Sequence, residues 1–74
     1  MSNFNLSPDS GLVVFSGNDC GKCESLKLQL NTKKVPFTEY NVHDNADAAE
    51  FLRSKGYRGI PVVFLNGKPA VLNG

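Results

Sequence analysis

The stretch Asn18-Asp19-Cys20-Gly21-Lys22-Cys23 lies between a short apolar run and a helical pattern. It holds both cysteines of the 74-residue chain, with two residues between them. A disulfide across so short a loop would add little stability. The pair is therefore poorly explained as a structural staple, which leaves redox chemistry and metal binding.

The composition predicts one small globular domain over residues 1–74. Hydrophobic residues make up 41% of the chain, and the formal net charge is +1. A charge this close to zero gives no electrostatic basis for binding nucleic acid or a membrane surface. No apolar run approaches the roughly 20 residues of a membrane span, and the N-terminus lacks the basic start and apolar core of a signal peptide. We therefore expect a cytoplasmic, reducing location. Residues 1–10 are expected to form a loosely ordered lead-in.

Hydrophobic periodicity predicts an α/β chain with the element order β-α-β-α-β-β. Continuous apolar runs are typical of buried strands, and apolar side chains every three to four residues are typical of helices. Gly56 is placed to end the second helix, and Asn66-Gly67 is a hairpin signal between the last two strands. The predicted strands and helices cover residues 11–16, 20–34, 37–42, 46–55, 60–65 and 69–72.

The four predicted strands form a mixed sheet in the order 2-1-3-4. The first and third strands are apolar throughout, which places them in the centre of the sheet. Pro36 and Pro69 open the other two strands, where a missing backbone N–H is tolerated at a sheet edge. The first two strands are then parallel and joined by a right-handed crossover.

Each predicted helix has one apolar face. In the first helix, Cys23, Leu26 and Leu30 share this face. Leu28 lies off it, so we expect some other part of the protein to cover that side chain. In the second helix, the apolar face consists of Ala48, Phe51 and Leu52.

Cys20 is predicted to lie at the N-terminus of the first helix, where the thiolate form of a cysteine is favoured. Cys23 follows one turn later on the same face, within reach of a disulfide and directed toward the core. This arrangement combines an exposed attacking thiol with a sheltered resolving thiol. Lys22 favours the thiolate and Asp19 opposes it, so their effects nearly cancel beyond that of the helix end. We expect a reducing dithiol couple.

The alternative is a metal or iron–sulfur site. Tetrahedral zinc takes four ligands, and His43 is the one histidine that could join the two cysteines. A zinc site within one chain is therefore not expected. A dimer that binds a metal or an iron–sulfur cluster through Cys20 and Cys23 of two chains stays open. His43 by itself is interpreted as a solvated loop residue without a role.

A second motif, Gly59-Ile60-Pro61-Val62-Val63, leads into the third strand. Most X-Pro bonds are trans. The pattern alone does not decide between a cis bond and a proline that simply opens a strand.

Together the two motifs resemble the thioredoxin superfamily and its glutaredoxin branch. Asn18-Asp19-Cys20-x-x-Cys23, the alanine-rich second helix and Gly56-Tyr57-Arg58-x-x-Pro61-Val62-Val63 are similar to the pattern of the small NrdH-type redoxins, which reduce ribonucleotide reductase. The resemblance runs from about Leu12 to Leu65. It implies a minimal thioredoxin/glutaredoxin-like fold that lacks the usual C-terminal helix.

The resemblance also implies a dithiol–disulfide oxidoreductase with no cofactor. Cys20 would attack a protein disulfide and Cys23 would resolve the intermediate. Pro61 would be cis and face the cysteine pair, and the backbone of Ile60 would pair with an extended substrate segment. The two basic residues beside this groove would attract an acidic partner. The candidate substrate-binding residues are Lys22, Arg58, Gly59, Ile60 and Pro61.

The partners expected from the resemblance are protein disulfides, with ribonucleotide reductase as the named example. Glutathione-using glutaredoxins typically follow the fourth strand with Gly-Gly and an acidic residue that opens a last helix. Residues 71–74 have neither feature, so thioredoxin reductase is favoured over glutathione as the electron source. Separately, the helix end and the nearly cancelling charges around Cys20 predict a redox couple nearer to thioredoxin than to the strongly oxidising DsbA.

The missing last helix also affects the predicted surface. We expect part of one sheet face to be bare, or to be covered by Phe4 and Leu6 of the lead-in or by a second subunit. A monomer is the expected state, and a weak dimer is the alternative.

Overall fold

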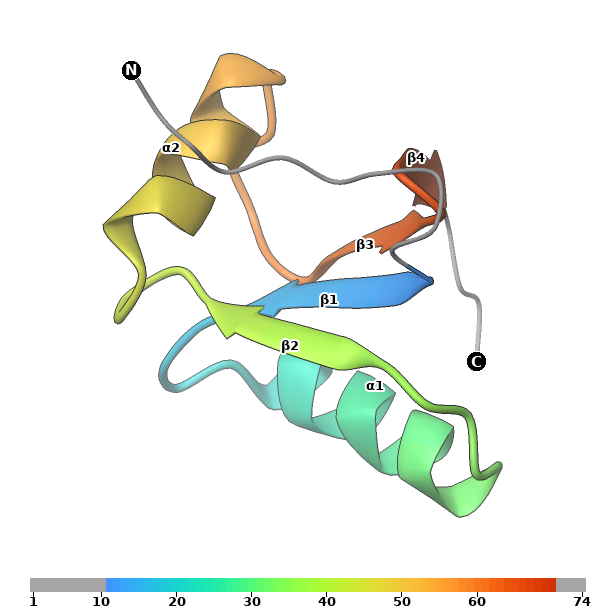
Figure 1. Cartoon of the computed structure of the whole chain (residues 1–74). Helices are drawn as coiled ribbons and strands as arrows, with labels where there is room; N and C mark the ends of the chain where they lie inside the picture. The colour runs from blue at the N-terminus through green and yellow to red at the C-terminus, as the bar shows by residue number, and fades with distance from the viewer. Residues whose placement is uncertain (1–10, 71–74) are drawn as a thin grey trace.

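A computed structural model describes residues 11–70 and contains the predicted elements in the predicted order (Figure 1). The lead-in over residues 1–10 and the end of the last predicted strand lie outside the described residues. The elements are β1 (Leu12–Ser16), α1 (Gly21–Thr32), β2 (Thr38–Asn41), α2 (Ala46–Ser54), β3 (Val62–Leu65) and β4 (Lys68–Ala70).

The predicted sheet order is confirmed, because the strands are arranged β2-β1-β3-β4. β1 pairs with β2 in parallel and with β3 antiparallel, and β3 pairs antiparallel with β4. Phe15 of β1 lies opposite Tyr40 of β2 on one side and opposite Val62 of β3 on the other. The two apolar strands are thus central, and β2 and β4 are the edges.

The two helices cover opposite faces of the sheet (Figure 1). Side chains alternate between the faces of a strand, so neighbouring residues of β1 enter different cores. On the α1 side, the buried cluster consists of Val14, Leu26, Leu30 and Val63. On the α2 side, it consists of Val13, Phe15, Ala48, Leu52 and Phe64. Phe15 is the centre of this second cluster, with its ring centroid 5.7 Å from those of both Phe51 and Phe64.

The residues predicted to form turns have the positive φ values that such turns need. Asn66 and Gly67 have φ values of +53° and +82°, as a tight turn between antiparallel strands requires. Gly56 has a φ of +89° directly after α2, a conformation typical of the residue that ends a helix.

Several details differ from the prediction. β3 begins at Val62 rather than at Ile60, because Pro61 has no backbone N–H to donate to the sheet. Leu65 is 48% exposed, so this strand is not buried along its whole length. Leu28 is 67% exposed on α1, so the expectation that another part of the protein covers it is wrong.

The sheet face beside α1, part of which was expected to be bare, contains a cavity. A cavity of about 360 Å³ lies against Leu26 and the β3–β4 pair. Phe4 and Leu6, the residues predicted as its cover, lie outside the described part of the chain. None of the described helices has both the length and the apolar character that a membrane crossing requires.

Candidate functional site

Cys20 is the residue that caps the N-terminus of α1. Its backbone is extended, with φ −111° and ψ 97°, and its Sγ accepts a hydrogen bond of 3.1 Å from the backbone N–H of Cys23. The first N–H groups of a helix have no partner within the helix. Here the sulfur takes the place of the usual oxygen cap, so the helix supplies a hydrogen-bond donor to the cysteine.

Cys20 and Cys23 form a disulfide, and their Cα atoms are 5.2 Å apart. Cys23 is fully buried on the inner face of α1, whereas Cys20 is partly exposed. A molecule that approaches from solvent therefore reaches the Cys20 sulfur first.

Behind the pair, an ion-pair network connects α1 to the sheet. Lys27 Nζ lies 2.8 Å from Glu39 Oε2 and 2.9 Å from Glu24 Oε1. The buried Ser16 hydroxyl also donates to Glu39 Oε2. The Lys27 ammonium, followed by the Ser16 hydroxyl, holds the pKa of the Glu39 carboxyl below its usual range. In turn Glu39, followed by Glu24, raises the pKa of Lys27.

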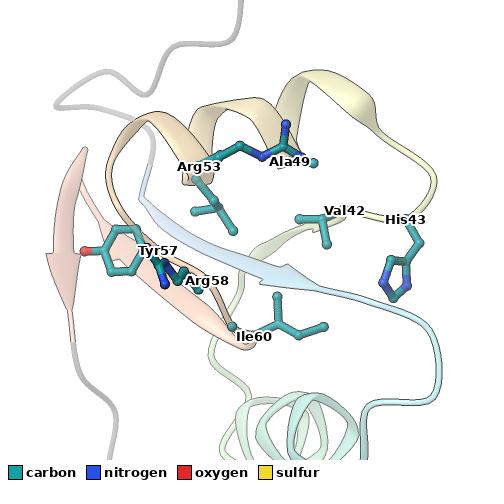
Figure 2. A pocket seen from close by; sticks show the side chains of 9 residues that line it. Val42, His43, Ala49, Arg53, Tyr57, Arg58 and Ile60 are labelled. Carbon is teal, nitrogen blue, oxygen red and sulfur yellow. The ribbon is translucent and has the colours of Figure 1, made fainter.

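The Ile60–Pro61 peptide bond is cis. Pro61 lines a hollow of about 530 Å³ against the first two turns of α1. Ile60 lines a different hollow of about 370 Å³ beneath α2 (Figure 2). The proline segment thus separates two concave surfaces, of which one lies beside the cysteine-bearing helix.

The two predicted basic residues lie in different hollows. Lys22 shares its hollow with Pro61, and Arg58 shares the other with Ile60 and Arg53. Neither Lys22 nor either arginine forms an ion pair within residues 11–70. Gly59 is exposed, and a Cβ atom placed on it would meet nothing within 4 Å. The backbone before Pro61 is therefore accessible between two sets of unpaired cations.

His43 contributes to this region, although no role was predicted for it. Its Nδ1 accepts a hydrogen bond of 2.6 Å from the backbone N–H of Asn18, two residues before Cys20. A usable signal was present in the sequence, because Asn18 and His43 each follow one of two adjacent parallel strands. The carboxyl ends of parallel strands meet at the same edge of a sheet.

The described residues contain no cluster of three or more histidine, cysteine, aspartate or glutamate side chains suited to a metal ion. A metal or iron–sulfur site shared between two chains is a property of an assembly. It stays an alternative for the cysteine pair.

An α/β sheet with a Cys-x-x-Cys disulfide at the start of its first helix and a cis-proline before its third strand defines a thioredoxin-fold redox protein. The family model described as Glutaredoxin matches residues 12–70. The chain belongs to the glutaredoxin family.

Individual relatives agree with this assignment. The chain is 35% identical over 52 residues to the glutaredoxin-like protein NrdH of Escherichia coli, covering 70% of this chain and 64% of that protein. It is 36% identical over 59 residues to N-acetyl-S-hydroxy-L-cysteine reductase of Bacillus subtilis, covering 78% of this chain and 63% of that protein. The chain thus spans a little under two thirds of the length of these relatives.

A solved structure is similar as well. The NrdH-redoxin of Escherichia coli, reported for its thioredoxin-like activity profile, superimposes with a TM-score of 0.68 at 34% identity. The match covers 72% of this chain and 70% of that chain. The chain is accordingly a glutaredoxin-like redoxin with a Cys-x-x-Cys disulfide, similar to NrdH proteins.

Proposed function

We propose that this protein is a dithiol–disulfide oxidoreductase that reduces protein disulfides. The observation that supports it most strongly is the asymmetry of the cysteine pair. Cys20 is accessible and receives a hydrogen bond from a helix N-terminus, whereas Cys23 is buried within disulfide distance. Thiol exchange needs one sulfur that attacks and a second that resolves.

The reaction begins with the reduced pair. The Cys20 thiolate attacks one sulfur of the partner disulfide, forms a mixed disulfide and releases the other partner sulfur as a thiolate. The Cys23 thiolate then attacks Cys20 Sγ, closes the Cys20–Cys23 disulfide and frees the second partner sulfur. Two electrons pass to the partner, and two protons complete its thiols.

The segment Arg58 to Pro61 is the proposed substrate platform. The exposed Gly59 and the backbone of Ile60 would pair with an extended partner segment that carries the disulfide. Arg58 begins this segment and Lys22 lies beside Pro61, and the two cations would favour a partner with acidic residues near its cysteines.

For the physiological partners, we propose ribonucleotide reductase as the protein reduced and thioredoxin reductase as the electron source. The support is the similarity to NrdH proteins, one of which has a thioredoxin-like activity profile. Glutathione is the alternative electron source.

The similarity to the Bacillus subtilis reductase favours a second candidate substrate, a small S-hydroxylated cysteine derivative. In that reaction the Cys20 thiolate attacks the hydroxylated sulfur and displaces hydroxide, which becomes water on protonation. Cys23 then releases the small thiol and closes the disulfide. The two electrons again come from the dithiol.

The proposal is tested with the variants Cys23→Ser and Cys20→Ser and with insulin as a defined disulfide substrate. Without its resolving thiol, Cys23→Ser is expected to accumulate a mixed disulfide between Cys20 and an insulin chain. Mass spectrometry under non-reducing conditions identifies it. Cys20→Ser should form no such species, because Cys23 is buried.

Equal trapping by both variants, or by neither, would contradict the assigned order of attack. A small-molecule reductase would instead leave insulin untouched, and Cys23→Ser would gain only the mass of the cysteine derivative.

A further inference from the structure

The loop that carries Cys20 forms a hydrogen bond with the ring of His43, two residues after the end of β2. The backbone N–H of Asn18 donates to His43 Nδ1 at 2.6 Å. Because a backbone N–H can only donate, Nδ1 must act as the acceptor, and the ring proton must be on Nε2. This hydrogen bond therefore exists only while the imidazole is uncharged.

The Asn41 side chain closes the same network. Its Nδ2 donates to Asn18 Oδ1 at 3.1 Å, and its Oδ1 accepts from the backbone N–H of His43 at 2.8 Å. A reversed amide would break both bonds, so the orientation is set by the network. Asn41 thus fixes the position of His43 and also holds Asn18.

Packing joins this network to the proline segment. A Cβ atom on the buried Gly17 would lie 2.5 Å from Ile60 Cδ1 and 2.9 Å from His43 Cε1. The backbone before Cys20 therefore fits tightly between the His43 ring and the Ile60 side chain. Figure 2 shows His43 and Ile60 facing each other below α2.

We propose that His43 is a positioning residue for the redox site: its uncharged imidazole fixes the backbone of the Cys20 loop against the segment that precedes Pro61. This inference rests on the proposed dithiol function. Protonation would place an N–H on Nδ1 opposite the N–H of Asn18, and the hydrogen bond would be lost. Asn18 would then keep only its side-chain hydrogen bond to Asn41, and attack by Cys20 would slow.

Several charged groups surround the imidazole. Asp19 follows Asn18 in the redox loop, and Asp44 follows His43 in its own loop. Glu50 and Arg53 of α2 line a hollow with His43, and Arg58 does so from the proline segment. Both signs of charge are present, and the Cys20 thiolate adds a negative charge on reduction. The experiment must therefore separate loss of the hydrogen bond from a change in local charge.

Nuclear magnetic resonance follows the hydrogen bond directly in the reduced wild-type protein. We expect the amide proton of Asn18 to shift with pH together with the ring resonances of His43, because the two groups share one hydrogen bond. Protection of that amide from exchange, relative to its intrinsic exchange rate at each pH, should decrease as the imidazole is protonated. This readout does not require activity, so it remains valid if the proposed function is wrong.

Two variants test the effect on chemistry. His43→Asn places a non-titrating oxygen close to the position of Nδ1, and we expect it to keep the wild-type rate of insulin reduction at pH 7.5. His43→Ala removes the acceptor and should slow the reaction about three- to tenfold, the effect of losing one modest hydrogen bond. In both variants the dependence of the rate on pH should be weaker than in the wild type and should follow the Cys20 thiolate alone.

An Asn18 amide that does not follow the His43 titration would overturn the proposal. So would a pH–rate profile of His43→Asn identical to that of the wild type. Rates are compared only between variants whose unfolding midpoints remain above the assay temperature. If both variants unfold, the resonance experiment on the wild type still shows whether the His43 ring holds the Asn18 amide. If the wild type itself reduced no disulfide, the proposed function would fail, while the resonance titration would still show whether His43 holds the loop.

Discussion

At Gly17 the backbone of the redox loop lies against both the His43 ring and the Ile60 side chain. We predict that Gly17→Ala lowers the free energy of unfolding by about 1–3 kcal/mol, because the added methyl group requires neighbouring side chains to move. It should also slow disulfide reduction, since both displaced side chains adjoin the site. Chemical denaturation and insulin reduction measure the two effects.

Gly21→Ala is the matched control, because a Cβ atom there would meet nothing within 4 Å. Its stability should be unchanged or raised by up to about 1 kcal/mol, as expected for alanine in a helix. Equal stability of the two variants would show that the space around Gly17 is less restricted than the structure indicates.

The sequence predicted the two cysteines as a redox pair, because their spacing and their place before a helix are local features. Burial of Cys23 followed from its helical spacing with Leu26 and Leu30, and all three are buried. The contribution of His43 was missed because Asn18 lies 25 positions away in the chain. A single loop histidine carries no local signal for so distant a contact.

At the scale of elements, α1 is connected to β1 and β2 through Glu39, Lys27 and Ser16. The pKa of Glu39 is lowered in the folded state, mainly by Lys27 and then by Ser16. The resulting stabilisation is complete above the pKa that a glutamate has in the unfolded chain. It is lost as the pH falls through the lower pKa of the folded state.

We therefore predict that Glu39→Gln lowers the free energy of unfolding at pH 7 by about 0.5–1 kcal/mol, the range of a partly exposed ion pair. The difference from the wild type should be smaller at about pH 3 than at pH 7, because the unfolded chain binds the carboxyl proton below the ordinary glutamate pKa and the stabilisation is lost toward the lowered pKa of the folded carboxyl. Urea denaturation at the two pH values measures this.

Glu24→Gln serves as the comparison, because Glu24 is 71% exposed in its pair with Lys27. Its effect at pH 7 should be smaller, about 0.2–0.5 kcal/mol. A difference between Glu39→Gln and wild type that stayed constant down to pH 3 would exclude the carboxylate as its source.

Strand positions could be predicted well because continuous apolar runs and prolines distinguish central from edge strands. The start of β3 could not be predicted to the residue, since Pro61 has no backbone N–H to donate to the sheet and an apolar run does not show where strand pairing begins. The exposure of Leu28 was also unpredictable from periodicity, which shows that a residue lies off the apolar face but not what lies opposite it.

At the scale of the whole molecule, the structure resembles NrdH-redoxin, and the chain spans about two thirds of the E. coli NrdH protein. The basic residues Lys22, Arg53 and Arg58 line the two hollows that adjoin the proline segment. An acidic protein partner would be attracted to this side of the molecule. The electron donor and the reduced partner are therefore the properties that an assay must establish.

Reduction of insulin measures whether the Cys20–Cys23 pair transfers electrons to a protein disulfide. Catalytic amounts of the protein are mixed with insulin, NADPH and thioredoxin reductase, and both NADPH oxidation and insulin thiols are recorded. Parallel reactions contain glutathione with its reductase, or the Cys20→Ser variant. We expect two insulin thiols for each NADPH consumed with the wild type, faster turnover with thioredoxin reductase than with glutathione, and the background rate with Cys20→Ser. If the wild-type protein, even after prior reduction with dithiothreitol, yields no more insulin thiols than Cys20→Ser, the pair does not reduce protein disulfides.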